Sequence, residues 1–385
     1  MKKSIILLVV FFSISSWGQT KDIRRNIEAI MERYDAVGLS AVVVKDNKII
    51  YQESFGINPT NAAPEEKKLI KNDDLYWIGS ISKSFVGVAI MQLVEKRIIR
   101  LDDDVNEYLR FRVRSPFFPE VPITIGMLLC HRSGLNDSQY GWSLNMFTTK
   151  DTERYKRNFN NYKPGTAYFY TNLGYSLLAA VIESATGSRF DKYVEKEILS
   201  PLKIGGSYNL LNIDSTRFVH AYRFNEKKKK FEESPMLYDY DYLKENLVEY
   251  KLGYSTPIFS PAGGMKMTAG DLAVYMRMFM NYGRIGWKRL LRKKTVIDMW
   301  SPQASDNNYG LGLTSYTNIV LNKTFIGMRG GSHGFHSIMV FDPEKRYGFV
   351  VLNNGYNTTA VNRSDMNFAV VRALYRYFIQ EGNEN

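Results

Sequence analysis

Hydrophobic and polar residues alternate along the chain in three patterns, and each predicts a different element. Apolar residues recur at helical spacing over 22–36, and residues 39–57 contain two strand-like runs around a turn at Asp46–Asn47. From Phe85 to Val94 nearly every position is apolar, which predicts a helix buried on all sides. The start of the chain is therefore expected to form an outer helix, a hairpin and a central helix.

A second group of strands is predicted near the end of the chain. Residues 323–331, 336–343 and 346–354 have the pattern of a meander that turns at 343–346. Residues 369–382 are expected to close the chain as a helix.

The middle of the chain is helical and poor in strand patterns. Residues 173–187 predict a helix that stops at Gly187, and residues 268–283 predict another with Thr268 as its N-cap. Strand patterns at both ends with helices between them predict an antiparallel sheet, flanked by terminal helices, beside an inserted and mostly helical region.

We therefore expect an α/β (α+β) fold of two domains. Residues 19–98 and 261–385 would form the sheet domain, and residues 99–260 the helical domain. The chain has 385 residues, of which 44% are hydrophobic and 14% aromatic, so it can bury a large core.

The first 18 residues have the pattern of a secretory signal peptide. Lys2 and Lys3 precede an apolar run from Ile5 to Phe12, and small residues follow. Cleavage is placed before Gln19; a retained N-terminal anchor is the alternative, although the apolar run is too short to span a bilayer. This interpretation predicts an exported protein, periplasmic or extracellular, with no stable membrane insertion after the signal peptide (1–18) is removed.

The single cysteine and the distribution of charge argue against a disulfide-stabilised protein, a cysteine nucleophile and a nucleic-acid-binding protein. Cys130 is the only cysteine, so an internal disulfide is excluded, and its apolar neighbours predict a buried thiol rather than a nucleophile. The formal net charge is +12, but the one basic run, Lys227–Lys230, lies between acidic residues and predicts a hairpin tip or loop. Nucleic-acid binding would need a clustered basic face, so no nucleic-acid partner is expected. Weak attraction to anionic lipid or wall polymer stays open.

The front of the central helix breaks the local sequence rules. A capping serine prefers Glu or Gln three residues later, whereas Ser80 is followed by Lys83. The helix dipole disfavours a cation there by about 0.3–1 kcal/mol. A serine nucleophile needs a neighbouring base, and a buried lysine whose pKa is lowered can supply one. The pair is therefore either an unusual helix start or a nucleophile with its base.

Two further segments carry groups suited to such a site. Tyr170 and Asn172 precede the apolar helix at 173–187, although by themselves they are compatible with a loop and a core tyrosine. The stretch 327–337, "GMRGGSHGFHS", is rich in glycine, which permits close approach of a ligand to the backbone. An edge strand there can offer a backbone N–H to an oxyanion and can pair with an extended substrate.

Taken together, Ser80-x-x-Lys83, Tyr170-x-Asn172 and the glycine-rich strand near 328 resemble the serine β-lactamase and penicillin-binding protein superfamily. The resemblance is to its class C-like branch, which includes AmpC-type enzymes, D,D-carboxypeptidases, D-aminopeptidases and family VIII esterases. The stretches 123–135 and 260–276 resemble "T-x-x-x-L-L-x-H-x-S-G-L" and "P-A-G-G-x-x-S-T-A-x-D-L" of that branch. The resemblance implies a β-lactamase/transpeptidase-like fold and an acyl-enzyme mechanism.

The resemblance also implies a role for each position. Ser80 would be the acylated nucleophile, Lys83 would activate it, and Tyr170 would shuttle the proton. Asn172 would bind the substrate amide and help to hold Lys83. A backbone N–H of the strand would complete the oxyanion hole with that of Ser80. The substrate-binding positions on the strand would be Met328, Arg329, Gly330, Gly331 and Ser332. No metal or cofactor is implied.

The final strand departs from the family pattern. The branch usually has Lys-Thr-Gly or His-Thr-Gly, whereas this chain has Met328-Arg329-Gly330. The missing cation usually meets a substrate carboxylate, and Arg329 is expected on the opposite face of the strand from its neighbour. The departure favours hydrolysis of an ester or amide in a small-molecule or peptide substrate, cell-wall fragments included. The alternatives are D,D-carboxypeptidase or β-lactamase-type activity, a non-catalytic penicillin-binding or peptidoglycan-sensing relative, and a basic wall-binding protein.

The histidines and two long segments complete the sequence-based expectations. His333 and His336 are too few for a zinc site, which needs three or four ligands, and His131 falls on a position that the family uses structurally. The segments 136–165 and 205–260 are expected to shape the pocket, with the aromatic and acidic stretch 238–250 as a candidate cleft wall.

Overall fold

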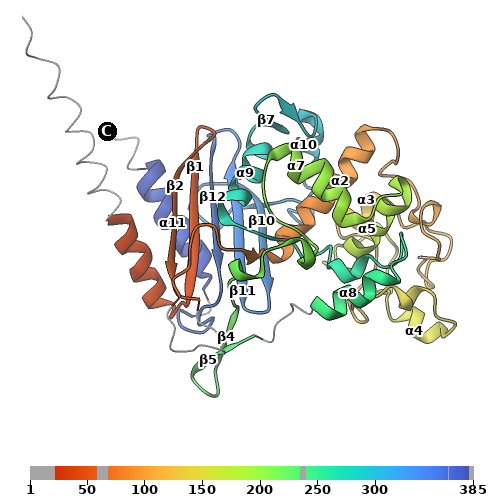
Figure 1. The fold of residues 1–385 in the computed structure, drawn as a ribbon. Helices are drawn as coiled ribbons and strands as arrows, with labels where there is room; N and C mark the ends of the chain where they lie inside the picture. Colours follow the sequence, from red (N-terminus) through yellow and green to blue (C-terminus); the bar gives the residue numbers. More distant parts are fainter. Residues whose placement is uncertain (1–21, 59–67, 235–239, 363, 381–385) are drawn as a thin grey trace, which may run out of the picture.

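A six-stranded antiparallel sheet stands at the centre of the protein (Figure 1). The structure is a computed structural model that describes residues 22–58, 68–234, 240–362 and 364–380. The strand order is β2-β1-β12-β11-β10-β9. These strands are β1 (Gly38–Lys45), β2 (Lys48–Gly56), β9 (Thr314–Tyr316), β10 (Phe325–Ser332), β11 (Phe335–Asp342) and β12 (Tyr347–Asn353).

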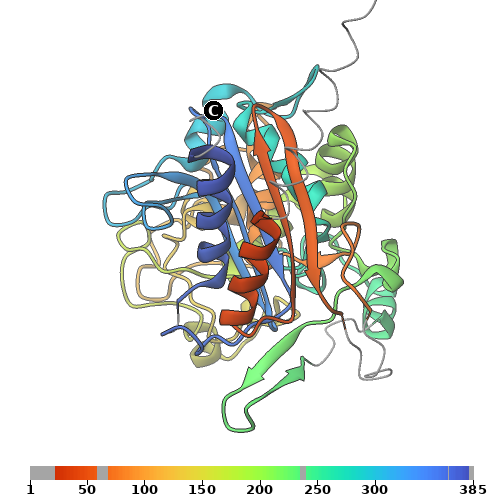
Figure 2. The ribbon, with the colours of Figure 1, turned by 90° about the vertical axis from the view of Figure 1, so that its left-hand side faces the viewer.

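Helices cover both faces of this sheet. The N-terminal helix (22–33) and α11 (Met366–Tyr375, continued by a π-helical turn over Arg376–Gln380) lie side by side on one face (Figure 2). Helix α9 (Ala269–Met280) packs on the other face, against β1, β11 and β12.

The pattern within β1 follows from burial on both faces. Leu39, Ala41 and Val43 pack in the core under the terminal helices, whereas Val42 and Val44 pack in the core toward the helical block. Successive side chains of a strand point to opposite faces, so a strand covered on both sides is apolar without interruption. This is why β1 is apolar without interruption from Ala41 to Val44.

The helical block lies beside the sheet and is built around two buried helices, α2 (Ser82–Glu95) and α5 (Leu173–Thr186) (Figure 1). The other helices are α3 (Ile125–Leu129), α4 (Thr152–Lys156), α6 (Phe190–Val194), α7 (Ser200–Leu202), α8 (Tyr240–Val248) and α10 (Lys293–Trp300). The short strands are β3 (Tyr76–Trp77), β4 (Tyr222–Asn225), β5 (Lys230–Glu233), β6 (Lys266–Met267), β7 (Arg284–Ile285) and β8 (Lys288–Arg289).

Most of the predicted elements are confirmed. The hairpin turns at Asp46–Asn47, Gly187 ends α5 in the left-handed conformation, and the Thr268 hydroxyl accepts the backbone N–H of Asp271 at the start of α9. The last helix begins at Met366, three residues before the predicted start, because Asp365 caps it. The Lys227–Lys230 run lies at the tip of the β4–β5 hairpin, and Cys130 is buried.

Two expectations are not tested by the described residues. The signal peptide and its cleavage site fall within 1–21, outside the described part of the chain. The domain boundaries at 98 and 260 stay predictions. Within the described segments, no helix combines the length and apolar character needed to cross a membrane.

A close backbone approach joins the helical block to the sheet. The 3₁₀ turn η1 (Gly79–Ile81), which precedes α2, packs on β10. A Cβ atom on Gly330 would lie 2.1 Å from the Ile78 carbonyl oxygen and 2.4 Å from Ser337 Oγ. The Ser337 hydroxyl donates to that same carbonyl at 2.7 Å. Glycine at 330 is therefore required for the packing that positions η1.

Replacing Gly330 with alanine is expected to lower the free energy of unfolding by about 1–3 kcal/mol. The backbone at Ile78 and the strand β11 would both have to move away from the new Cβ atom. The matched control is Gly331→Ala, whose new Cβ meets only the Phe335 carbonyl oxygen, at 4.0 Å. It should change stability by less than about 0.5 kcal/mol. Urea unfolding of both variants measures the difference, and equal losses would contradict this account of the packing.

Candidate active site

The buried helix α2 can begin with polar residues because each of them forms hydrogen bonds inside the protein. Ser82, Lys83 and Ser84 are all buried. The Ser82 hydroxyl accepts the backbone N–H of Met265 at 3.1 Å, and the Ser84 hydroxyl donates to the Ile81 carbonyl at 2.7 Å. Buried polar groups are tolerated when they are hydrogen-bonded in this way.

Ser80 is not a helix cap. It lies inside η1, and neither η1 nor α2 has a side-chain cap. Its Oγ instead accepts hydrogen bonds from Lys83 Nζ at 3.1 Å and from the Tyr170 hydroxyl at 2.8 Å. The sequence break at the front of the helix therefore brings together a hydroxyl, an amine and a phenol.

Lys83 is held by neutral oxygen atoms. Its Nζ donates to Ser80 Oγ, to Asn172 Oδ1 at 2.7 Å and to the Ala262 carbonyl at 2.9 Å. Within the described residues it forms no salt bridge, and its side chain is completely buried. Burial lowers its pKa to about 7, although the charge of Asp137 acts in the opposite direction. An amine in this condition can exchange a proton near neutral pH.

Asp137 organises the other side of the site, a role that the sequence patterns do not predict. Its carboxylate accepts the backbone N–H groups of Asn172 and Leu173 and the side chains of Thr171 and Asn172, at 2.6–3.0 Å. Asn172 is the N-cap of α5 but makes no capping bond itself. The aspartate therefore satisfies the open helix end and orients the amide that holds Lys83. No short-range pattern signals this role, because the two segments are 35 residues apart.

Aromatic rings hold Tyr170 in place. The His131 ring lies 4.3 Å from that of Tyr170 and 4.6 Å from that of Tyr309, between centroids. His131 Nδ1 accepts the backbone N–H of Thr171 at 3.2 Å, and burial keeps the pKa of this histidine well below its usual value. Burial also raises the pKa of Tyr170 above its usual range, so the phenol stays protonated. A neutral His131 packed this way supports the structural role that the sequence suggested for it.

A cavity of about 340 Å³ opens onto Ser80. Gly331 and Ser332 of β10 line it, as does His333 in the following turn. Its other lining residues are Trp77, Tyr140, Gly141, Trp142, Asn172, Ser260, Ala262 and Gly263. The 136–165 segment thus contributes to the cavity through residues 140–142. Of the candidate wall 238–250, residues 238 and 239 lie outside the described part, and Tyr242 on α8 packs near Trp142 at 6.1 Å between rings.

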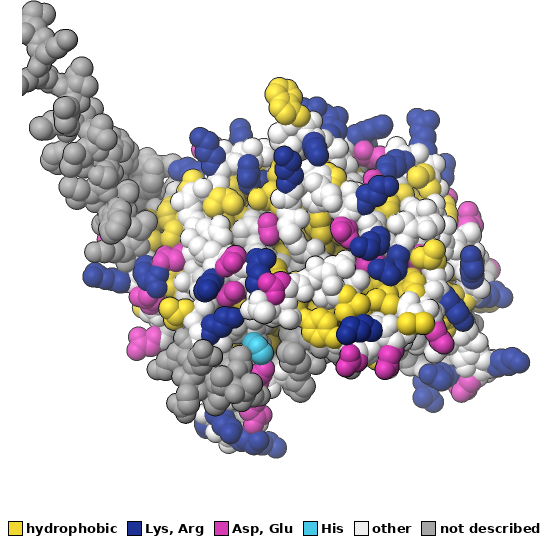
Figure 3. Space-filling model, viewed as in Figure 1, with side chains coloured by type: hydrophobic (Ala, Val, Ile, Leu, Met, Phe, Trp, Pro, Cys, Tyr) yellow, Lys and Arg dark blue, Asp and Glu magenta, His cyan; other side chains and the backbone are white. Residues whose placement is uncertain are grey.

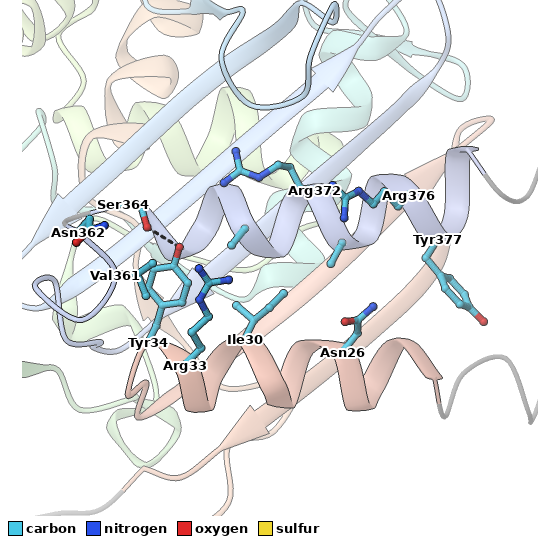
Figure 4. A pocket seen from close by; sticks show the side chains of 12 residues that line it. Asn26, Ile30, Arg33, Tyr34, Val361, Asn362, Ser364, Arg372, Arg376 and Tyr377 are labelled. Atoms are coloured by element: carbon cyan, nitrogen blue, oxygen red, sulfur yellow. Dashed lines mark hydrogen bonds between the residues drawn. The ribbon is translucent and has the colours of Figure 1, made fainter.

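A larger cavity, of about 710 Å³, lies on the opposite face of the sheet. Figure 4 shows it between the N-terminal helix and α11, where Tyr34 and Ser364 share a 2.7 Å hydrogen bond and Arg33, Arg372 and Arg376 project. None of its lining residues forms a nucleophile–base pair of the kind found at Ser80. The smaller cavity is therefore the candidate active site.

Met328, Arg329 and Gly330, which depart from the family pattern, have different surroundings because successive positions of a strand point to opposite faces of the sheet. Met328 is buried in the core on the side of the helical block. Arg329 points to the other face, where it pairs with Asp365 and lies 4.7 Å above the Phe368 ring. Gly330 backs onto η1, so of the five predicted strand positions only Gly331 and Ser332 line the cavity.

The two histidines near this strand have separate surroundings. His333 Nδ1 hydrogen-bonds Ser332 Oγ at 2.8 Å, whereas the ring of His336 packs 4.7 Å from that of Tyr356. Across the described ranges no three His, Cys, Asp or Glu side chains converge as metal ligands would.

Basic side chains are dispersed over the face seen in Figure 3, with acidic ones among them. At the hairpin tip, Lys228 pairs with Glu232 at 2.8 Å. Such dispersion gives little support to a basic wall-binding surface.

Asp137→Ala is expected to lower the free energy of unfolding by about 1.5–3 kcal/mol, because several donors lose a charged acceptor. The matched control is Asp151→Ala, which removes the cap of the short surface helix α4 through a single bond to the Arg154 N–H. The control should cost about 1 kcal/mol. Urea unfolding compares the two, and a smaller loss for Asp137→Ala would show that the carboxylate does not organise α5.

Comparisons with known proteins identify relatives of this chain. The family described as Beta-lactamase matches residues 23–371. A "Putative D-alanyl-D-alanine carboxypeptidase" of Escherichia coli (strain K12) is 25% identical over 342 residues, covering 83% of this chain and 78% of the relative. An "N-acetylmuramyl-L-alanine amidase" of Bacillus subtilis (strain 168) is 24% identical over 375 residues, covering 89% and 83%. The octameric penicillin-binding protein homologue from Pyrococcus abyssi superimposes with a TM-score of 0.72 at 24% identity, over 94% of this chain and 77% of that one.

Proposed function

The chain belongs to the Beta-lactamase family, and from that premise we propose that it is a serine hydrolase that forms an acyl-enzyme at Ser80 and cleaves an ester or amide. The observation that carries the proposal is the contact of Ser80 Oγ with both Lys83 Nζ and the Tyr170 hydroxyl. We further propose that the protein is exported and acts on small-molecule or peptide substrates, cell-wall fragments included.

The proposed reaction begins with neutral Lys83. Its Nζ takes the proton of Ser80 Oγ as that oxygen attacks the substrate carbonyl carbon. The carbonyl oxygen becomes an oxyanion, for which the backbone N–H groups of Ser80 and Gly331 are the candidate donors. Because Gly331 carries no side chain, its backbone can approach the substrate closely.

Tyr170 completes the proton path. As the tetrahedral intermediate collapses, the phenol gives its proton to the leaving alcohol or amine and takes up the proton that Lys83 accepted from Ser80. A water molecule then attacks the acyl carbon and loses a proton to Lys83, which passes it to Ser80 Oγ as the bond between that oxygen and the acyl carbon breaks and the acid product leaves. The raised pKa of Tyr170 keeps the phenol protonated until the leaving group takes its proton, and the pKa of Lys83 suits that residue as the base.

The position of Met328 favours substrates without the carboxylate that the family usually binds there. The names of the relatives favour the alternative, a D,D-carboxypeptidase or β-lactamase-type enzyme, and a non-catalytic sensor would use the same cavity. Rapid release of D-alanine from a D-Ala-D-Ala peptide would replace the ester or amide proposal with the carboxypeptidase one.

Intact mass after incubation with a fluorophosphonate tests the nucleophile, with turnover of p-nitrophenyl butyrate measured in parallel. The native protein should gain one adduct and turn over the ester, and Ser80→Ala should lose the adduct and at least about 1,000-fold in kcat, as loss of a triad member does. The matched control is Ser305→Ala, at an exposed serine, which should retain both. An adduct without turnover would favour the sensor, and no adduct would end the enzyme proposal.

The pH dependence of kcat/KM tests Lys83 as the base. The amine must be neutral to accept the Ser80 proton, so kcat/KM should rise with pH through about 7 and fall about tenfold per pH unit below it. Asp137→Asn removes a charge that raises the pKa of Lys83, and should therefore move this acid limb to lower pH.

Profiles between pH 5 and pH 9 provide the measurement for this pair of expectations. Asp151→Asn, on the surface helix α4, is the control that should leave the limb in place. A limb that stays fixed or moves to higher pH in Asp137→Asn would exclude Lys83 as the titrating base.

A further inference from the structure

A second lysine is buried near the candidate active site, and the proposed reaction does not use it. Lys266 is 3% exposed and lies on β6, directly opposite Trp77 of β3. Its backbone also pairs with Ser207, through two hydrogen bonds of 3.0 Å. The backbone of Lys266 is thus fixed on both sides, and its side chain has a defined direction.

The ammonium group of Lys266 is poorly compensated. Its Nζ donates to the Tyr208 carbonyl at 3.3 Å and lies 4.6 Å above the Trp77 ring. No salt bridge to it is formed among the described residues, and burial alone lowers its pKa to about 7. A buried cation without an anion is costly to fold, and an isosteric apolar residue is commonly neutral or stabilising at such a position. Stability therefore does not account for a lysine here.

The side chain of Lys266 lines a pocket of about 200 Å³. Aromatic rings form much of its wall, from Trp77, Trp142, Tyr208, Tyr242 and Phe259. Trp77, Trp142 and Ser260 belong to this pocket and also to the cavity at Ser80, so the two spaces adjoin. A substrate bound at Ser80 would therefore have the aromatic pocket as its neighbour.

We infer that the aromatic pocket binds a carboxylate at the end of an apolar or aromatic arm of the substrate, with Lys266 as its cation. Beside the Trp77 ring, two of the three N–H donors of the ammonium have no hydrogen-bond acceptor among the described residues, and a carboxylate can accept from both. The aromatic wall supplies contact area for the arm and excludes water, which strengthens the pairing of charges. The inference rests on the proposed function only in that the bound group is part of a substrate.

In this arrangement the anion-binding site of the cleft would lie at β6 and not at the strand position that is usual in the family. The strand position where relatives usually carry a cation is Met328, buried in the core, and Arg329 is engaged by Asp365 on the far face. Lys266 instead approaches from β6, across the wall formed by Trp77. The selected substrates would then be esters or amides whose carboxylate stands away from the scissile bond, in a direction set by the pocket.

Equilibrium binding of 3-phenylpropionate and of 3-phenylpropionamide, followed by tryptophan fluorescence at pH 6.5, tests the inference. The two compounds differ only in charge and hydrogen-bonding group, and Trp77 and Trp142 in the pocket wall report binding. The native protein should bind the acid at least about tenfold more tightly than the amide, the effect of one charged hydrogen bond. Lys266→Met, which removes the charge and keeps an unbranched side chain one atom shorter, should lose this preference while retaining its melting temperature.

The matched control is Lys244→Met on α8, where the lysine side chain is 63% exposed and follows the pocket residue Tyr242 by two positions in the sequence. It should bind both compounds as the native protein does. Equal binding of acid and amide by the native protein would overturn the inference, as would a preference that survives in Lys266→Met. The same titrations on Ser80→Ala separate the two proposals, because the carboxylate preference should persist there even if no Ser80-dependent adduct forms.

Discussion

The burial of Lys83 against neutral oxygen atoms is the interaction on which the site depends. An ammonium group in water is strongly hydrated, and here that hydration is replaced by a hydroxyl, an amide oxygen and a backbone carbonyl. Desolvation therefore dominates over attraction, and the pKa falls toward neutrality. A carboxylate in direct contact would reverse the balance and leave a permanent cation. Asp137 makes no such direct contact. It accepts a hydrogen bond from the Asn172 amide, and the oxygen of that amide accepts one from Lys83.

The fold provides this environment by joining distant parts of the chain. Lys83 begins a helix that follows β3, Asn172 begins α5, and Ala262 lies in the loop before β6. The turn that carries Ser80 is pressed against β10, where only glycine fits between Ile78 and Ser337. Because β1 pairs with β12, the N-terminal and C-terminal segments form one sheet, whose strand β10 contributes Gly331 and Ser332 to the cavity (Figure 1).

The parts of this arrangement that the sequence predicts are those with a local or periodic signal. The strands and buried helices follow from apolar periodicity, and the separation of Met328 from Arg329 follows from the two-residue period of a strand. Lys83 is conspicuous because it is a cation at the front of an apolar helix. Asp137 gives no such signal, since its partners are brought to it by the fold. Lys266 lies on a two-residue strand, too short for a pattern, and its burial comes from loops and from Trp77.

The lysines Lys83 and Lys266 are both buried, but their hydrogen-bond partners suit them to different roles. Desolvation lowers both pKa values to about 7, so that property by itself marks neither residue as the base. Lys83 makes three short hydrogen bonds, one of them to a hydroxyl that can give up a proton. Lys266 makes one long bond to a carbonyl, which has no proton to exchange, and its side chain lines a pocket. The first environment suits proton transfer, whereas the second suits recognition of an anion, since only an arriving carboxylate restores the charge that burial has made costly.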